Sequence, residues 1–135
     1  MSKVEFRREL NFLDVPMTSG ALDINAGDNI NYNASGFGKA GADTEGEKFA
    51  GVAMEDLHVS ATENATAGGC VLRIIPANCG NIVRRKVAGT RATAIPGTKV
   101  LVKNATEMSI AATTKNVAGG VIAAYHSDTE CDVVI

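Results

Sequence analysis

The sequence contains two stretches that open with the same kind of tight turn and continue into an alternating run. The first is residues 26–33, Ala-Gly-Asp-Asn-Ile-Asn-Tyr-Asn, and the second is residues 96–103, Pro-Gly-Thr-Lys-Val-Leu-Val-Lys. In each stretch a glycine next to a polar residue favours a turn, and the apolar residues that follow at every second position are typical of a half-buried β-strand. We therefore expect a β-strand directly after each turn.

The similarity between the two halves continues beyond these turns. Gly51, in Phe-Ala-Gly-Val-Ala-Met, follows Gly27 by 24 residues, and Gly120, in Ala-Gly-Gly-Val-Ile-Ala, follows Gly97 by 23 residues. Further strand-like runs follow at 70–75 and 131–135. The pattern predicts an internal duplication, in which a turn–strand–glycine–strand unit is used twice around one small barrel, while chance similarity competes in a chain rich in Ala, Gly and Val.

The remainder of the sequence from residue 21 onward indicates an all-β fold. Short β-branched runs alternate with turn residues, as expected of a small β-barrel or β-sandwich domain over residues 21–135. The single helical candidate, residues 43–50, is short. The chain has 135 residues, of which 45% are hydrophobic and only 4% aromatic, so we expect one compact domain with a core of small aliphatic side chains.

Residues 1–20 read as an extended N-terminal arm. Charges are dense here, and the apolar positions fit neither a helical nor a strand period before Pro16 and the Thr-Ser-Gly cluster at 18–20. Large apolar side chains on such an arm are expected to be covered by a neighbouring subunit or another protein, with the charges around them as a rim. A first strand packed on its own domain is the alternative. The candidate contact residues are Phe6, Arg7, Arg8, Phe12 and Leu13.

The charge balance excludes several partners. Thirteen Lys and Arg against 15 Asp and Glu give a net charge of −2, which argues against a dedicated nucleic-acid binder. The apolar runs are too short to span a membrane, and residues 1–20 lack the apolar region of a secretory signal, so we expect synthesis in the cytoplasm.

The basic run Arg84-Arg85-Lys86 leaves three interpretations open: a nucleic-acid contact, a charge-protected edge strand, or a contact with an acidic partner surface. Strand alternation would place Arg84 and Lys86 on one face and Arg85 on the other.

No constellation of residues in the sequence predicts chemistry. His58 and His126 could be combined with Asp128 and Cys131 into a metal site, but no pair among them has a chelating spacing. Three cysteines without a secretory signal indicate reduced thiols. We therefore expect a protein that is not an enzyme, with no catalytic residue, cofactor or metal.

Residues 24–135 resemble the small capsid cement, or head decoration, proteins of tailed bacteriophages. The resemblance rests on AGDNINYNASGFGKAGADTEGEKFAGVAMEDL (26–57), PGTKVLVKNATEMS (96–109), NVAGGVIAAYHSD (116–128) and CDVVI (131–135). It implies a compact β-barrel-like domain that clusters, commonly as trimers, on the outside of the capsid shell, often with an N-terminal arm in the contact.

From this resemblance we expect a structural virion protein that binds the outer capsid surface and stabilises the assembled shell. Its partners would be the major capsid protein and further copies of itself, as a homotrimer. The alternatives are a β-barrel ligand- or metal-binding module that uses His58 or His126, and another virion component such as a tail protein.

Overall fold

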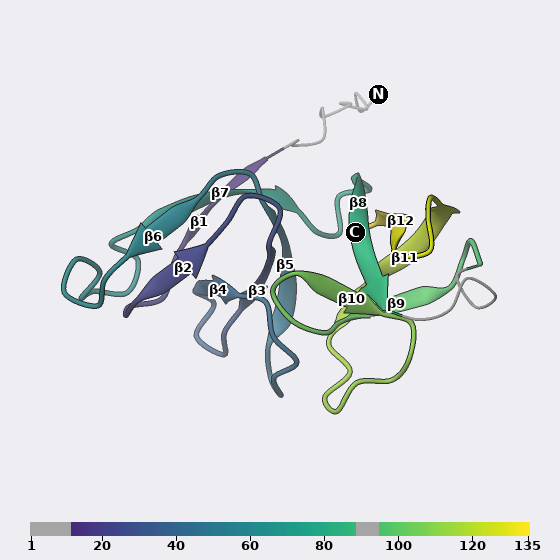
Figure 1. The fold of residues 1–135 in the computed structure, drawn as a ribbon. Coiled ribbons are helices and arrows are strands. Elements are labelled where there is room, and N and C mark those ends of the chain that lie inside the picture. The colour runs from purple at the N-terminus through teal and green to yellow at the C-terminus, as the bar shows by residue number, and fades with distance from the viewer. Residues whose placement is uncertain (1–11, 89–94) are drawn as a thin grey trace, which may run out of the picture.

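The computed structural model describes residues 12–88 and 95–135, and every regular element in these ranges is a β-strand (Figure 1). The predicted all-β class is confirmed. No helix forms at 43–50, where a loop leads into a strand.

The N-terminal half forms a curled five-stranded sheet. Its strands, in spatial order, are β1 (Leu13–Pro16), β7 (Val71–Pro76), β5 (Lys48–Ala53), β3 (Asn29–Tyr32) and β4 (Gly38–Ala40). A parallel bridge between Met17 and Gly38 joins the two ends of this sheet. A smaller sheet of β2 (Leu22–Ile24) and β6 (Leu57–Val59) lies beside it. We call the bridged five-stranded sheet the first barrel.

The C-terminal half forms a closed five-stranded barrel, which we call the second barrel. Its strands, in spatial order, are β10 (Glu107–Ser109), β8 (Ile82–Ala88), β12 (Glu130–Val134), β11 (Ala118–Tyr125) and β9 (Lys99–Val102). All neighbours are antiparallel except β10 and β8, which run parallel and close the barrel.

The two barrels repeat one another strand by strand, so the predicted duplication is confirmed. β1, β3, β4, β5 and β7 take the places of β8, β9, β10, β11 and β12. The turn contacts repeat as well, because the amide of Gly27 donates to the carbonyl of Ala53 and the amide of Gly97 to the carbonyl of Ile122, both at 2.8 Å. The expectation that both units enclose a single barrel is wrong, because the closed barrel contains only strands of the C-terminal half, while the N-terminal half forms a sheet of its own.

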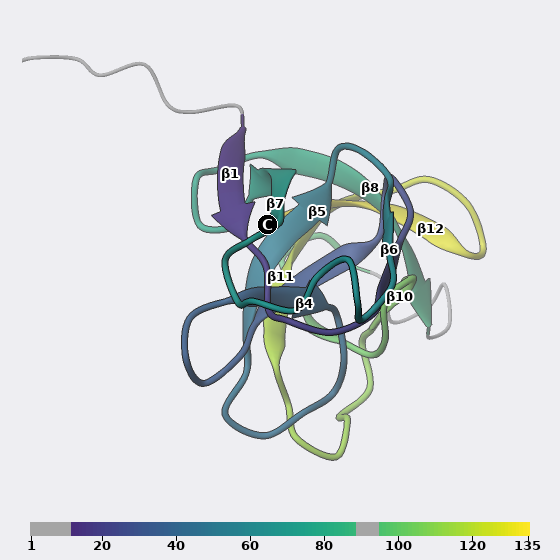
Figure 2. The same cartoon turned by 90° about the vertical axis from the view of Figure 1, so that its left-hand side faces the viewer.

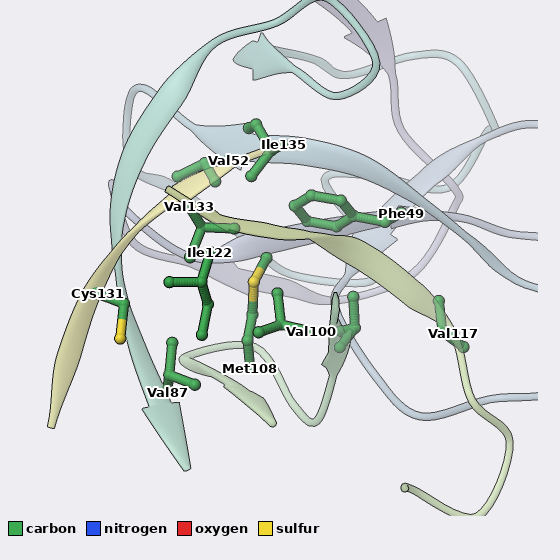
Figure 3. Packing of buried hydrophobic residues seen from close by; sticks show 11 residues of the cluster. Phe49, Val52, Val87, Val100, Met108, Val117, Ile122, Cys131, Val133 and Ile135 are labelled. Carbon is green, nitrogen blue, oxygen red and sulfur yellow. The ribbon is translucent and has the colours of Figure 1, made fainter. Parts of the chain in front are cut away.

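Each barrel has its own apolar core, and one strand contributes to both. The first core contains Val15, Met17, Leu22, Ile24, Ile30, Ala50, Ala53, Leu72 and Ile74. The second core is built from β8 to β12 but also includes Phe49 and Val52 of β5 (Figure 3). The pairing of β5 with β3 skips one residue of β5 at Ala50, and this β-bulge puts Ala50 and Ala53 in the first barrel and Phe49 and Val52 toward the second. This shared strand holds the barrels side by side.

The boundary expected for the arm, at residue 20, is wrong. Leu13–Pro16 form β1 and pair with β7, and Val15 and Met17 are fully buried in the first core. The alternative, a first strand packed on its own domain, therefore holds for residues 13–16. Pro16 is tolerated because β1 pairs with a neighbouring strand on one side only, where the missing amide of proline does no harm. Residues 1–11 lie outside the described residues.

Candidate interaction surface

An apolar surface lies on β1 and β7, at the point where the described chain begins. Three of the six large hydrophobic side chains exposed in the described ranges share the outward side of these strands: Phe12 (44% exposed), Met54 (45%) and Val71 (51%). Figure 2 shows β1 and β7 side by side at one margin of the fold. We call the surface formed by Phe12, Asp14, Met54, Val71 and Arg73 the β1–β7 face. Apolar groups gathered in this way are typical of a contact surface.

Arg73 lies at the centre of the β1–β7 face. Its Nε donates to Oδ1 of Asp14 at 3.1 Å, and its guanidinium carbon lies 4.4 Å from the centre of the Phe12 ring. The hydrogen bond from Arg73 to Asp14 raises the pKa of Arg73. Both partners are about half exposed, so this pair adds little stability and serves to orient the Phe12 ring.

The structure brings together only part of the set predicted from the sequence. Phe12 lies on the β1–β7 face, and Leu13 is partly exposed on the opposite side of β1, with Val15. Phe6, Arg7 and Arg8 fall outside the described residues. Met54 and Arg73 were missed because they reach this face only through the pairing of β5, β7 and β1. The amide of Met54 donates to the carbonyl of Arg73 at 3.0 Å, and Arg73 lies opposite Asp14.

The basic run at 84–86 is engaged within the chain. Nε of Arg84 lies 3.1 Å from Asp132, and Nζ of Lys86 lies 3.8 Å from Glu107. The predicted alternation is confirmed, because Arg84 and Lys86 are exposed and Arg85 is buried. The interpretation as a protected edge strand holds only for part of β8, because β12 pairs with residues 82–86 and β10 with residues 86–88, so residues 82–85 have a paired neighbour on one side only.

Arg85 joins the two barrels. Its Nη1 donates to the carbonyl of Gly27 and its Nη2 to Oδ1 of Asn29, both at 2.6 Å. Nδ2 of Asn29 in turn donates to the carbonyls of Asn104 and Glu107 in the second barrel. Burial lowers the pKa of Arg85, and nearby Asp28 partly opposes this effect. These hydrogen bonds hold the two barrels together, while Nε of Arg85 is buried without a hydrogen-bond partner.

The residues considered for a metal site do not assemble into one. His58 in β6 contacts Asp23 of β2, while His126 follows β11 and donates its backbone amide to Glu130. Within residues 12–88 and 95–135, no group of three His, Cys, Asp or Glu side chains is arranged to hold a metal ion. Cys70, Cys79 and Cys131 are free thiols, and burial raises the pKa of Cys131. The described ranges contain no helix long and apolar enough to cross a bilayer.

Comparison with protein-family models and with curated proteins finds no match to the chain. What the protein does therefore has to be inferred from its own residues.

Proposed function

We propose that the protein is a structural virion protein that binds the outside of a phage capsid and stabilises the assembled shell. The observation that carries the proposal is the β1–β7 face, an exposed apolar surface that continues covalently into the segment holding Phe6, Arg7 and Arg8. The resemblance of residues 24–135 to capsid cement proteins supports it.

The β1–β7 face suits a partner that adds apolar cover around a central charged group. Burying exposed apolar area contributes about 25 cal/mol per Å², or about 2 kcal/mol for a large side chain. Phe12, Met54 and Val71 would supply this term, while Asp14 and Arg73 would keep polar partners at the rim. A contribution of this size from each copy is sufficient, because many copies act together on one lattice.

In this proposal the partners are the major capsid protein and two further copies of the chain. A shell under internal pressure parts at the junctions between its subunits. A small barrel that covers a junction buries surface that exists only while the shell is closed. It therefore stabilises the closed shell without any chemical step.

The test is binding to expanded capsid shells of the phage that encodes the chain, measured by co-sedimentation and counted as copies per particle. The variant Phe12→Ser/Val71→Ser removes two exposed anchors of the β1–β7 face. We expect its apparent affinity to fall at least about tenfold, because about 1.4 kcal/mol is enough for that change.

The matched control is Ile82→Ser. Ile82 is 64% exposed and begins β8, the counterpart of β1, but lies outside the β1–β7 face. It should bind shells like the unmodified protein, and thermal unfolding should show that all variants are folded. Failure of the unmodified protein to bind shells, or equal binding by the Phe12→Ser/Val71→Ser variant, would overturn the proposal.

A further inference from the structure

The two barrels use equivalent outer faces differently. In the first barrel, the outer face of β3 and β5 is covered by the second barrel, so that Asn29, Phe49 and Val52 are buried. The cover over Asn29 is the turn at 104–107 between β9 and β10, where the carbonyl of Ala105 accepts the amide of Asn29 at 2.6 Å. Figure 1 shows β10 and the loop that precedes it beside β3 and β5.

The same face of the second barrel is open. By strand equivalence, Lys99, Ala118 and Val121 take the places of Asn29, Phe49 and Val52. Lys99 and Ala118 are exposed and Val121 is only half-buried. A cavity of about 290 Å³ lies over this β9–β11 face, with the side of Phe49 as one wall. Because alanine stands where the first barrel has phenylalanine, the β9–β11 face is hollow at the point where its counterpart is filled.

The covering turn also has a counterpart that covers nothing in the described chain. In the turn at 104–107, Oδ1 of Asn104 accepts the amides of Thr106 and Glu107, both at 2.9 Å. In the turn at 33–36, between β3 and β4, Oδ1 of Asn33 accepts the amides of Ser35 and Phe37, both at 3.0 Å. Both turns are therefore capped by the side chain of their first asparagine, and Ala34 stands exposed where Ala105 makes its contact.

We propose that the β9–β11 face of one copy binds the 33–36 turn of a second copy, head to tail. The contact repeats between chains the one that the 104–107 turn makes within a chain. The carbonyl of Ala34 would accept the amide of Lys99, and the turn would cover the hollow beside Ala118. Since the two surfaces are different patches, the interface is heterologous and can continue from copy to copy. This inference rests on the self-association in the proposed function and names its surface.

The contacts between the barrels fit a rotational repeat of this kind. Asp43, in the loop between β4 and β5, accepts hydrogen bonds from Thr113 and Lys115 in the equivalent loop between β10 and β11. Equivalent loops touch each other, whereas the turn-to-face contact runs one way only, from 104–107 onto Asn29. A two-fold relation would have repeated the turn-to-face contact in both directions. When equivalent loops touch and the turn-to-face contact runs one way only, the two units are expected to be related by a rotation of higher order than two, with the loops near its axis.

Engineered disulfide cross-linking tests the contact. The variant Ala34→Cys/Lys99→Cys is made in a Cys70→Ser/Cys79→Ser background and oxidised mildly, both free at high concentration and bound to shells. Intermolecular cross-links should form at least about tenfold faster than in a control, because the two thiols are held together. The matched control is Ala34→Cys/Ile82→Cys, since Ile82 is exposed on the second barrel but outside the β9–β11 face. Equal rates in the two variants, in solution and on shells, would overturn the inference.

A second variant separates this contact from shell binding. Ala118→Lys places a long charged side chain in the hollow and, because Ala118 is exposed, should leave the fold intact. We expect binding of single copies to shells to persist while the cooperativity between copies is lost. Unchanged cooperativity would refute the head-to-tail contact and leave shell binding standing. Rapid cross-linking of the Ala34→Cys/Lys99→Cys variant, in a protein that does not bind shells, would support the contact and refute the capsid proposal.

Discussion

Replacing Arg85 by methionine should uncouple the two barrels. Arg85 reaches from β8 to the carbonyl of Gly27 and the side chain of Asn29, and no other cation is buried at this junction among the described residues. Methionine keeps a long apolar stem but donates no hydrogen bond. The change therefore removes the two donors while preserving most of the packing.

The magnitude follows from the burial of the two acceptors. Gly27 is exposed, so water can replace the lost donor to its carbonyl. Asn29 is 0% exposed, so its Oδ1 would be left unpaired in the interior, which costs about 1–3 kcal/mol. Relief of the buried cation, whose Nε is buried without a partner, offsets part of this cost. We expect the free energy of unfolding to fall by about 2 kcal/mol.

Urea unfolding can follow each barrel separately, because Tyr32 belongs to the first barrel and Tyr125 to the second, and the chain has no Trp. We compare two variants that each keep one tyrosine. With Arg85 in place, both should unfold at the same urea midpoint, and with Arg85→Met they should unfold at two different midpoints. A double-mutant cycle with Asn29→Ala should give a coupling energy of about 1–2 kcal/mol. A coupling below about 0.5 kcal/mol, or a loss for the exposed control Arg84→Met as large as for Arg85→Met, would refute the reasoning.

The strand repeat, the second core and the loop contacts give three further predictions. Gly120→Ala should lower the free energy of unfolding by at least about 2 kcal/mol, because φ is 148° and an added Cβ would overlap the carbonyl oxygen of Val134. Cys131 should react with a thiol reagent only on unfolding. Because burial raises the pKa of Cys131, the free energy of unfolding should fall as the pH rises above about 8.5. Asp43→Ala should lower the thermal midpoint, because it removes the acceptor for Thr113 and for the amides of residues 114 and 115.

Each of these predictions has an internal control. Gly97→Ala places its Cβ in open space. Urea unfolding should therefore show a smaller loss in the free energy of unfolding for Gly97→Ala than for Gly120→Ala. Cys70 and Cys79 are half-buried and should be labelled before Cys131; simultaneous labelling would contradict the assignment of Cys131 to the core. Asp43→Asn keeps one acceptor oxygen and should recover part of the thermal shift, which a purely charge-based effect would not.

Many of the strand positions along the chain were predictable, because local turn chemistry and alternation coincide. Asn29–Tyr32 and Lys99–Val102 form strands at the predicted residues, and the repeated glycines Gly51 and Gly120 adopt nearly the same φ, 149° and 148°. These signals are local, since each turn and its following strand are specified by a few adjacent residues.

The remaining features depend on contacts between distant segments. β4 and β10 have only three residues each, too few for a periodic signal, yet they provide the parallel closures of the two sheets. Arg85 reads as one member of a surface run, and its burial follows only from the docking of the second barrel on Asn29. The candidate surface was found in part, because Phe12 adjoins the N-terminal segment. Arg73 reaches it through the pairing of β7 with β1, more than 50 residues away, and Met54 through the pairing of β5 with β7.

The shared strand β5 also sets an order of events during synthesis of the chain. All strands of the first barrel lie between residues 13 and 76, so this barrel can close while the ribosome is still translating the C-terminal half. Until residues 99–135 emerge, however, Phe49 and Val52 face water, because the side chains that cover them within the described residues belong to the second core. The nascent first barrel thus exposes an apolar surface at Phe49 and Val52, which the C-terminal half of the chain must cover before another polypeptide binds there. The N-terminal barrel is thereby the template on which the second one assembles.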